Sequence, residues 1–414
     1  MSRDTADAPV ILIVAFPISI HAARWVNTFR NRGFRVVLFP GVLQGMCIEF
    51  EPTRQVRCRA DLDALQPGEI GIYPREAVRG VTQADVDDPA VYPFALPAFD
   101  LPPEIRPDPD ALCEAVAAIR PDLVHSLELQ HCSYLAKEAR RRFGASFPPW
   151  VASCWGSDIF MYRKLKEHRP ILTKLVREVD ALHSDCARDL AWAEEKAGYD
   201  AYRFPQMPAS GGVDFSIFPD PARLSRPSER KMILVKGYHG WAGRGMHILY
   251  ALHLVAPQLK GFRIVVTHSG RPAAEMVERL ASEDGLDISL DPYLASNAEA
   301  MERLASARVA VGYGISDGIS TTLLEAMALG TFMIQANTCC GNEWVSNGST
   351  GLIVPPHDVV ALANAIVRAA TDDALVDDAV EINRATVEAR WNAETNGALI
   401  ANAYRELLGM RADE

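Results

Sequence analysis

The sequence predicts an α/β protein made of two doubly wound domains, each with a parallel sheet covered by helices on both faces. Short apolar runs typical of buried parallel strands alternate with segments of helical period along most of the chain. The runs form two series, of which the first ends before residue 205 and the second begins at residue 231. A segment rich in proline and glycine separates them, as expected for a hinge over 206–230.

The first series predicts an N-terminal domain over 1–205. Its expected strands lie at 10–16, 35–39, 122–127, 150–154 and 180–184, and its clearest helical segments at 21–32, 111–119 and 132–143. The first run, VILIVAF, follows Asp4 and Asp7, whereas a signal peptide needs a basic start and a longer apolar run. We therefore interpret it as the first strand. Residues 41–110 are irregular and rich in proline.

The second series predicts another domain over 231–390. Its expected strands lie at 231–237, 262–268, 307–313, 331–336 and 351–355, and its helical segments at 244–255, 297–306 and 358–370. In open α/β sheets, ligands bind beyond the carboxyl ends of the strands. The turns that follow these strands are therefore the first candidates for a site.

Composition and charge narrow the class of protein. A chain of 414 residues with 49% hydrophobic residues has room for two large globular domains. No run reaches the roughly 18 apolar residues of a membrane span. A net charge of −11 argues against a general nucleic-acid binder. The eight cysteines form no C-x-x-C pair, which favours reduced cytosolic thiols over a disulfide framework or a zinc site.

The charge balance reverses within residues 140–177. This segment has nine lysines and arginines against two acids. One interpretation is a solvated helix face. The other is a surface for an anionic acceptor or for anionic lipid head groups.

The most informative stretch is SDGISTTLLEAMALG, in which Asp317 and Glu325 bracket Ser320, Thr321 and Thr322. It follows an expected strand and begins a helix, whose first N–H groups have no intrahelical partner and attract anions. The stretch therefore predicts a diphosphate site, with simple N-capping by Ser320 or Thr321 as the alternative. Glu325 lies among apolar residues, where a carboxylate needs a partner such as a ribose diol.

The region from about 307 to 370 resembles the donor-binding half of retaining GT-B glycosyltransferases of family 4. It has the two acids separated by seven residues, then EAMALG, then TGLIVPPHD, without a gap. Weaker similarity extends over HAARWVNTF, RPDLVHSLELQ, CWGSD and GGVDFSIF. The resemblance implies a GT-B fold, with an acceptor-side domain over 1–205 and a donor domain over 231–390 that face a cleft. It also implies that 391–414 form a helix packing back across the domains.

The resemblance implies a role for each matching residue. Asp317 would lie against the donor sugar, Glu325 would hold the ribose, and a group of small residues would hold the diphosphate: Gly318, Ser320, Thr321 and Thr322. Family members usually add a basic pair after the first strand of this domain, and Lys236 and Arg244 match it here. Leu294 lies in a segment that would face the base.

Three departures from the family pattern affect these expectations. Aspartate stands at 317 where glutamate is usual, and the N-terminal glycine-rich loop is absent. Leu127 replaces the second histidine of a V-H-x-H motif, which leaves His125 as the catalytic candidate or as a structural histidine. On the acceptor side the candidates are His21 and Asp158, with Arg24 and His131 as weaker ones. Asp158 has helix capping as its alternative.

The resemblance implies a metal-independent glycosyltransferase without a cofactor. It would move a sugar from a nucleoside-diphosphate sugar to an acceptor hydroxyl with retention, during assembly of a cell-surface glycan or glycolipid. In such families the departing phosphate would assist the incoming hydroxyl. The acceptor would be a glycan, a lipid-linked molecule or a small molecule, and the protein would be cytoplasmic, at the inner face of the membrane through 140–177.

Two alternatives remain open. One is a nucleotide-sugar epimerase or hydrolase of the same fold, and the other is a catalytically silent sugar-nucleotide-binding protein. The D-x-D triplets do not follow apolar strands and therefore do not favour a manganese-dependent transferase. GYGISDG is a weak dinucleotide signal, since it has one residue too many.

Overall fold

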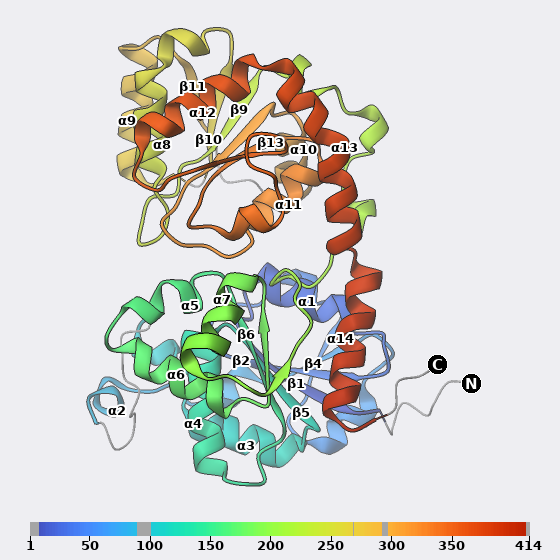
Figure 1. Cartoon of the computed structure of the whole chain (residues 1–414). Helices are drawn as coiled ribbons and strands as arrows, with labels where there is room; N and C mark the ends of the chain where they lie inside the picture. Colours follow the sequence, from blue (N-terminus) through green and yellow to red (C-terminus); the bar gives the residue numbers. More distant parts are fainter. Residues whose placement is uncertain (1–7, 89–100, 268, 292–296, 411–414) are drawn as a thin grey trace. The chain divides into compact units, whose positions relative to one another are not determined.

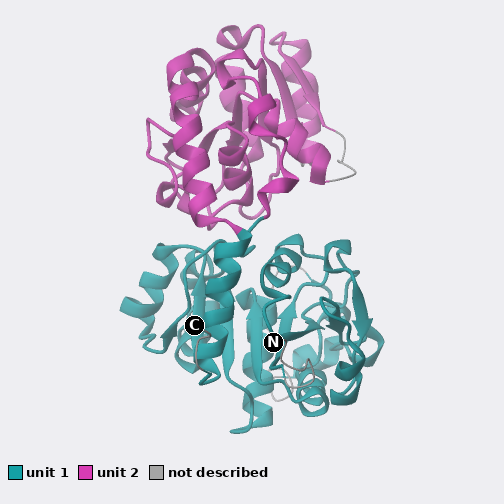
Figure 2. Cartoon of the chain, turned by 90° about the vertical axis from the view of Figure 1, so that its right-hand side faces the viewer, with its two compact units in different colours: residues 1–213, 393–414 teal, residues 214–392 magenta. Residues whose placement is uncertain are grey.

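A computed structural model describes residues 8–88, 101–267, 269–291 and 297–410. The chain divides into two compact units (Figure 2). The first contains residues 1–213 and 393–414, and the second contains residues 214–392. Each unit is built around one parallel β-sheet.

The sheet of the first unit has the strand order β3-β4-β2-β1-β5-β6-β7-β8. The strands are β1 Val10–Ala15, β2 Arg35–Pro40, β3 Thr53–Gln55, β4 Ile70–Ile72, β5 Leu123–Leu127, β6 Trp150–Cys154, β7 Ala181–Ser184 and β8 Tyr202–Arg203. Every residue of β1, β2, β5, β6 and β7 is buried, as expected for strands covered on both faces. The strands β3 and β4 lie in the segment where the sequence predicted no regular element, because three residues carry no readable pattern.

Helices cover both faces of this sheet (Figure 1). They are α1 Ile20–Phe29, α2 Gln83–Asp87, α3 Pro109–Ile119, α4 Tyr134–Phe143, α5 Ser157–Phe160, α6 His168–Glu178, α7 Ala187–Trp192 and α14 Ala393–Leu407. One core cluster joins the sheet to α1 and α14 through Trp25 and Tyr404. Another joins it to α3, α4 and α6 through Leu112, Leu135 and Leu172.

The sheet of the second unit has the order β11-β10-β9-β12-β13-β14. The strands are β9 Met232–Lys236, β10 Arg263–Thr267, β11 Asp287–Leu290, β12 Val309–Gly312, β13 Phe332–Ala336 and β14 Leu352–Val354. The helices are α8 Gly245–Leu254, α9 Arg271–Ser282, α10 Asn297–Ala305, α11 Thr321–Ala328, α12 Val359–Thr371 and α13 Asp373–Arg390. The chain winds outward from β9 in both directions, so the strand order reverses between β9 and β12.

The segment expected as a hinge is divided between the two units. Residues 214–230 belong to the second unit, where Ser228 Oγ donates a hydrogen bond to Asp377 on α13 at 2.7 Å. The buried Arg230 guanidinium donates to the carbonyls of Ala307 and Leu329, at the amino ends of β12 and β13. These contacts anchor the proline-rich stretch to the second unit.

The last helix belongs to the first unit. Tyr404 on α14 is completely buried, and its hydroxyl accepts a hydrogen bond from Trp25 Nε1 on α1 at 3.3 Å. Trp391, which precedes α14, lies in the second unit and packs against Phe215 and Phe218.

Candidate functional site

The strongest candidate site in the second unit lies at the carboxyl edge of its sheet, where the strand order reverses. From β9 the chain continues through α8 to β10, and from β12 it continues through α11 to β13 on the other side. The two loops that leave β9 and β12 are joined by backbone hydrogen bonds. Arg244 N–H donates to Tyr313 at 2.9 Å, and Ile315 N–H donates to Ala242 at 2.9 Å. Such a switch point is where open α/β sheets bind ligands.

Glycine makes the loop after β9 unusually tight. A Cβ added to Gly245 would lie 2.5 Å from the carbonyl carbon of Gly237. A Cβ added to Gly243 would lie 2.6 Å from the carbonyl oxygen of Tyr238. The same turn is closed by a hydrogen bond of 2.9 Å from Gly245 N–H to the Tyr238 carbonyl. The loop therefore has no room for a side chain at these two positions, and its backbone groups can approach a ligand closely.

The two expected basic residues lie at the ends of this loop. Lys236 is the last residue of β9 and is half-buried. Arg244 immediately precedes α8, and its Nη1 donates to the carbonyls of Gly240 and Gly243, both at 2.8 Å. The Arg244 guanidinium thus braces its own loop while keeping a positive charge at the switch point.

The acidic and hydroxyl residues lie across from that loop, where α11 begins. Ser320 occupies the N-cap position, but its side chain makes no capping hydrogen bond. Of the two residues that the sequence offered for simple N-capping, Ser320 and Thr321, Ser320 therefore does not cap the helix through its side chain. Asp317 Oδ1 accepts from Gly318 N–H at 2.9 Å, and the Gly318 carbonyl accepts from Cys340 N–H at 3.0 Å. These bonds fix the turn in front of Thr321 and Thr322, the first residues of α11.

Glu325 is half-buried on the second turn of α11, between the buried Leu324 and Ala326. Asp317 thus lies in a turn before α11 and Glu325 lies on the helix, which is the arrangement that their spacing in the sequence predicted. Leu294 lies outside the described residues. Next to that segment, Asp291 is paired with Arg303 at 3.2 Å.

A cluster of three histidines lies at the same edge of the second unit and was not found from the sequence. The His247 ring lies 6.4 Å from the His239 ring and 5.9 Å from the His357 ring. Burial, followed by the charges of His357 and Arg244, lowers the pKa of His247. His357 has a φ of +67°, which is rare for a residue with a side chain. No spacing rule could have found this cluster, because its members come from the loop after β9, the first turn of α8 and the turn before α12.

Two of the acceptor-side candidates of the first unit, His131 and Asp158, lie after β5 and β6. The carboxylate of Glu128 accepts from the N–H groups of Gln130, His131 and Cys132, and lies 3.2 Å from His131 Nδ1. Glu128 has a φ of +83°, so this turn is held in a strained conformation.

Asp158 links the turn after β5 to the turn after β6. It accepts from Leu129 N–H at 3.0 Å and from Trp155 N–H at 2.8 Å. Burial and the nearby Glu128 raise its pKa well above the ordinary value of a carboxyl group. The carboxyl group therefore ties the turn after β5 to the turn before α5. His21, on the first turn of α1, meets the Trp155 ring edge-on at 6.0 Å.

His125 does not have the geometry of a catalytic residue. It is completely buried, with Nδ1 2.6 Å from the Tyr404 hydroxyl and Nε2 2.7 Å from Ser153 Oγ. Ser153 Oγ also lies 3.0 Å from His183 Nδ1. Burial and the neighbouring His183 lower the pKa of His125 well below its usual value. His125 therefore fits the structural alternative and not the catalytic one. Both of its ring nitrogens take part in a buried hydrogen-bond network that links α14 to the sheet.

Most of the basic residues in 140–177 are paired with acids. Arg140 meets Asp180 at 2.7 Å, and Arg141 meets Glu138 at 2.6 Å. Arg142 also reaches Glu138, and Lys174 lies 3.6 Å from Glu178 on its own helix. This part of the segment is a self-neutralised surface. No helix in the described ranges is long and apolar enough to cross a bilayer.

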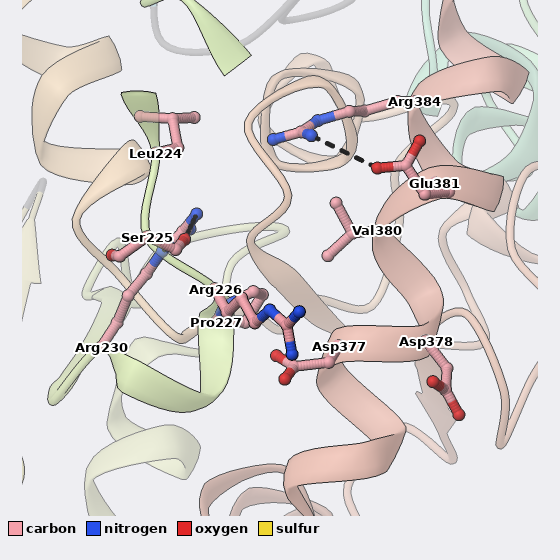
Figure 3. A pocket seen from close by; sticks show the side chains of 10 residues that line it. All are labelled: Leu224, Ser225, Arg226, Pro227, Arg230, Asp377, Asp378, Val380, Glu381 and Arg384. Atoms are coloured by element: carbon pink, nitrogen blue, oxygen red, sulfur yellow. Dashed lines mark hydrogen bonds and ion pairs between the residues drawn. The ribbon is translucent and has the colours of Figure 1, made fainter. Parts of the chain in front are cut away.

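A hollow of about 360 Å³ in the second unit lies away from this chemistry (Figure 3). It is lined by residues of the 224–230 segment and of α13, including Arg230 and Asp377. Figure 3 shows Arg384 directed toward Glu381, to which it is paired at 3.7 Å. Arg230 contacts the amino ends of β12 and β13, so the hollow is at the opposite edge of the sheet from Asp317.

Comparison with known proteins defines the fold class. The chain has the GT-B fold, with two parallel-sheet α/β units. Residues 235–372 match the family model of glycosyl transferases group 1, and residues 110–185 match glycosyl transferase 4-like. The carboxyl edges of the two sheets, where the candidate residues lie, fall within or next to these matched segments.

Two curated proteins are similar to part of the chain. Phosphatidyl-myo-inositol mannosyltransferase of Mycolicibacterium smegmatis is 28% identical over 211 residues, which are 50% of this chain and 51% of that protein. Exopolysaccharide phosphotransferase of Streptomyces coelicolor is 28% identical over 223 residues, which are 51% of this chain and 23% of that protein. The similarity therefore spans about half of the first relative and less of the second.

Solved structures match nearly the whole chain at low identity. HepE of Anabaena in complex with UDP-glucose has a TM-score of 0.67 at 12% identity, covering 96% of this chain and 99% of that one. Sucrose-phosphate synthase of Thermosynechococcus elongatus has a TM-score of 0.65 at 17% identity, covering 97% and 99%. At this identity the likeness establishes the fold.

Proposed function

We propose that the protein is a glycosyltransferase that uses a nucleoside-diphosphate sugar as donor. The observation that carries the proposal is the meeting of two loops at the strand-order reversal of the second unit. One loop is glycine-rich and ends in Arg244, and the other leads through Asp317 into α11. The match of this unit to glycosyl transferases group 1 supports it.

The donor would be held through its diphosphate and its ribose. The first turn of α11, where the Ser320 side chain makes no capping hydrogen bond, would present backbone N–H groups and the hydroxyls of Ser320 and Thr321 to the diphosphate. Lys236 and Arg244 supply positive charge, which offsets the negative charge that develops on the departing phosphate. Glu325 would accept hydrogen bonds from the ribose hydroxyls. These cationic and backbone groups would neutralise the diphosphate without a metal ion.

Transfer would proceed with retention at the sugar carbon. Asp317 would lie against the donor sugar, where positive charge develops in the transition state. The departing phosphate would take the proton of the incoming hydroxyl, so no side chain is needed as a base. The acceptor would bind at the carboxyl edge of the first unit, near Glu128 and Asp158. Trp155 Nε1 is buried there with no hydrogen-bond partner among the described residues, and a sugar or polyol hydroxyl could accept from it.

The biological setting is part of the same proposal. The mannosyltransferase relative acts, by its name, on a phosphatidyl-inositol, and the phosphotransferase relative on an exopolysaccharide. We accordingly place this chain in the assembly of a cell-surface glycan or glycolipid, on the cytoplasmic side of the membrane.

A ligand panel followed by a transfer assay tests the proposal. UDP, GDP and ADP, with their sugars, are first compared by thermal shift. A ligand at about 100 times its dissociation constant adds roughly 2.7 kcal/mol to the free energy of unfolding. Labelled donor is then incubated with and without acceptor, and the anomeric configuration of the product is read by NMR. Free sugar alone would indicate a hydrolase, an isomerised donor an epimerase, and binding without product a silent protein. If no nucleotide shifts the transition, the donor-site assignment is wrong.

A further inference from the structure

A cluster of cations at the carboxyl edge of the first unit is not explained by the donor chemistry. Phe160 ends α5, which follows β6, and three positively charged side chains surround its ring. Lys164 Nζ lies 3.6 Å from the ring centroid, Arg188 Cζ 3.9 Å and Arg163 Cζ 5.4 Å. Arg188 comes from α7, which follows β7. Two neighbouring loops thus bring their cations to the ligand-binding edge of the sheet.

The cluster carries more positive than negative charge. Arg188 is paired with the fully buried Asp189 at 2.8 Å. Within the described residues, neither Arg163 nor Lys164 forms an ion pair with a carboxylate. Burial, and then repulsion from Arg163 and Arg188, lowers the pKa of Lys164. Like charges held together at partial burial raise the free energy of the unliganded protein, and an anion relieves this repulsion.

The neighbouring basic residues show that this surplus is local. Arg140, Arg141 and Arg142 each reach an acid within 3 Å. Lys166, two residues beyond Lys164, is 92% exposed and lies 3.6 Å from Glu167. A surface that merely keeps the protein solvated has no need to gather unpaired cations around one aromatic ring. Their position at the Phe160 ring and their lack of an acid partner distinguish Arg163 and Lys164 from Arg140, Arg141, Arg142 and Lys166.

We infer that Arg163 and Lys164 bind a phosphate group carried by the acceptor substrate, with Arg188 supporting the site. The planar guanidinium of Arg163 can donate two parallel hydrogen bonds to phosphate oxygens, and Lys164 adds a compact charge. The inference rests on the proposed function, because it takes the carboxyl edge of the first unit as the acceptor side. It narrows the acceptor to an anionic one, either a phosphorylated soluble sugar or polyol or a lipid with a phosphate in its head group.

Calorimetry on the full chain tests the site without any catalysis. Inorganic phosphate, glucose 6-phosphate and glucose are titrated separately, and UDP, GDP and ADP are titrated as an independent readout of the donor site. Sedimentation with vesicles of phosphatidylcholine, alone or mixed equally with phosphatidylglycerol, examines the lipid source. We expect phosphate esters or the anionic vesicles to bind and glucose to bind far more weakly. Whichever of these anionic probes binds identifies the source of the phosphate.

Four variants locate the binding. Arg163→Gln and Lys164→Gln should each weaken binding of the phosphate probe about tenfold, because each removes a charged hydrogen bond. Lys166→Gln removes the same charge from an exposed neighbour and should change the affinity less than about twofold. Lys164→Arg keeps the charge and should retain most of the affinity. All variants should bind the nucleotide like the parent protein.

Two results would overturn the inference. One is that no phosphate probe and no anionic vesicle binds the parent protein. The other is that Lys166→Gln loses as much affinity as Lys164→Gln, which would mean a diffuse surface charge. Neither result affects the donor site. Conversely, failure of all nucleotides to bind would reject the proposed function whatever the phosphate probes do.

Discussion

Replacing Gly245 with alanine should disrupt the loop after β9 and with it the donor site. The added Cβ would meet the carbonyl oxygen of Gly237 at less than 3.0 Å and its carbonyl carbon at 2.5 Å. Ordinary contacts of such an atom begin near 3.4 Å, so the two backbone segments must separate by about 1 Å. Neither segment can rotate away as a side chain would. Gly237 N–H is itself bonded to the Thr267 carbonyl at 2.7 Å.

The cost follows from this overlap. Forcing extra atoms into a packed site lowers the free energy of unfolding by about 1–3 kcal/mol. Replacing glycine with alanine within a helix raises it by up to about 1 kcal/mol. The free energy of unfolding should therefore fall by about 1–2 kcal/mol. Separation of the loops also strains the bonds from Gly245 N–H to Tyr238 and from Arg244 N–H to Tyr313. We expect nucleoside-diphosphate affinity to fall at least tenfold, which is about 1.4 kcal/mol.

Urea unfolding and calorimetry with the best nucleotide measure the two effects. Gly270→Ala is the control, because Gly270 lies at the start of another helix of the second unit, where it is the N-cap residue of α9, and the nearest atom to its added Cβ is 4.0 Å away. If Gly245→Ala unfolds and binds nucleotide like Gly270→Ala, the close backbone approach is not needed by the site and the reasoning is wrong.

Three further predictions concern the two acids and the buried network. Asp317→Asn should lower the turnover number strongly and leave nucleotide binding nearly unchanged, whereas Glu325→Gln should weaken nucleotide binding by about 1–3 kcal/mol, as expected for a charged hydrogen bond. Burial lowers the pKa of His183 to about 4, so the unfolded chain binds its proton first as the pH falls. The stability that the neutral imidazole provides is complete above about pH 6.5 and should decline by about 1.4 kcal/mol per pH unit as the pH falls toward 4. Tyr404→Phe removes the hydroxyl that contacts His125 and should cost about 1–3 kcal/mol in urea unfolding.

Each of these has an outcome that would contradict it. Full activity in both acid variants would mean that the start of α11 has no role in transfer. A His183→Gln variant whose stability depends on pH as steeply as the parent protein's would place the titration elsewhere. For Tyr404, the control is Tyr250→Phe, because Tyr250 is 52% exposed on α8. An equal effect of the two tyrosine substitutions would exclude the buried network as the cause.

The sequence predicted the strands that are buried on both faces, because such strands have continuous apolar runs. VILIVA and WVASC are of this kind. It did not predict β3 and β4, each of whose three residues carry no pattern, and it left the catalytic and structural interpretations of His125 both open. A histidine within a strand has the same neighbours in sequence whether it faces a ligand or a core. Only the folded chain brings Tyr404 and Ser153 to its two ring nitrogens.

The candidate site was predictable where one short segment carries it. The turn at Asp317 and the helix with Glu325 are adjacent in the sequence, so their spacing indicated their arrangement. The histidine cluster depends on two loops and the first turn of α8, which the sheet brings together, and the pairing of Arg140 depends on an acid 40 residues away. Local patterns do not contain such long-range contacts.

The chain passes from the first unit to the second and back again, so the second unit is a continuous insert in the first. During synthesis, residues 214–392 can pair all their strands as soon as they have left the ribosome. The first unit must wait for α14, because its core remains open until Tyr404 arrives beside His125 and Trp25. The first unit, although most of it is synthesised first, therefore completes its folding after the second unit. Shortening the chain from its carboxyl end should expose the N-terminal core to proteases and leave the second unit folded.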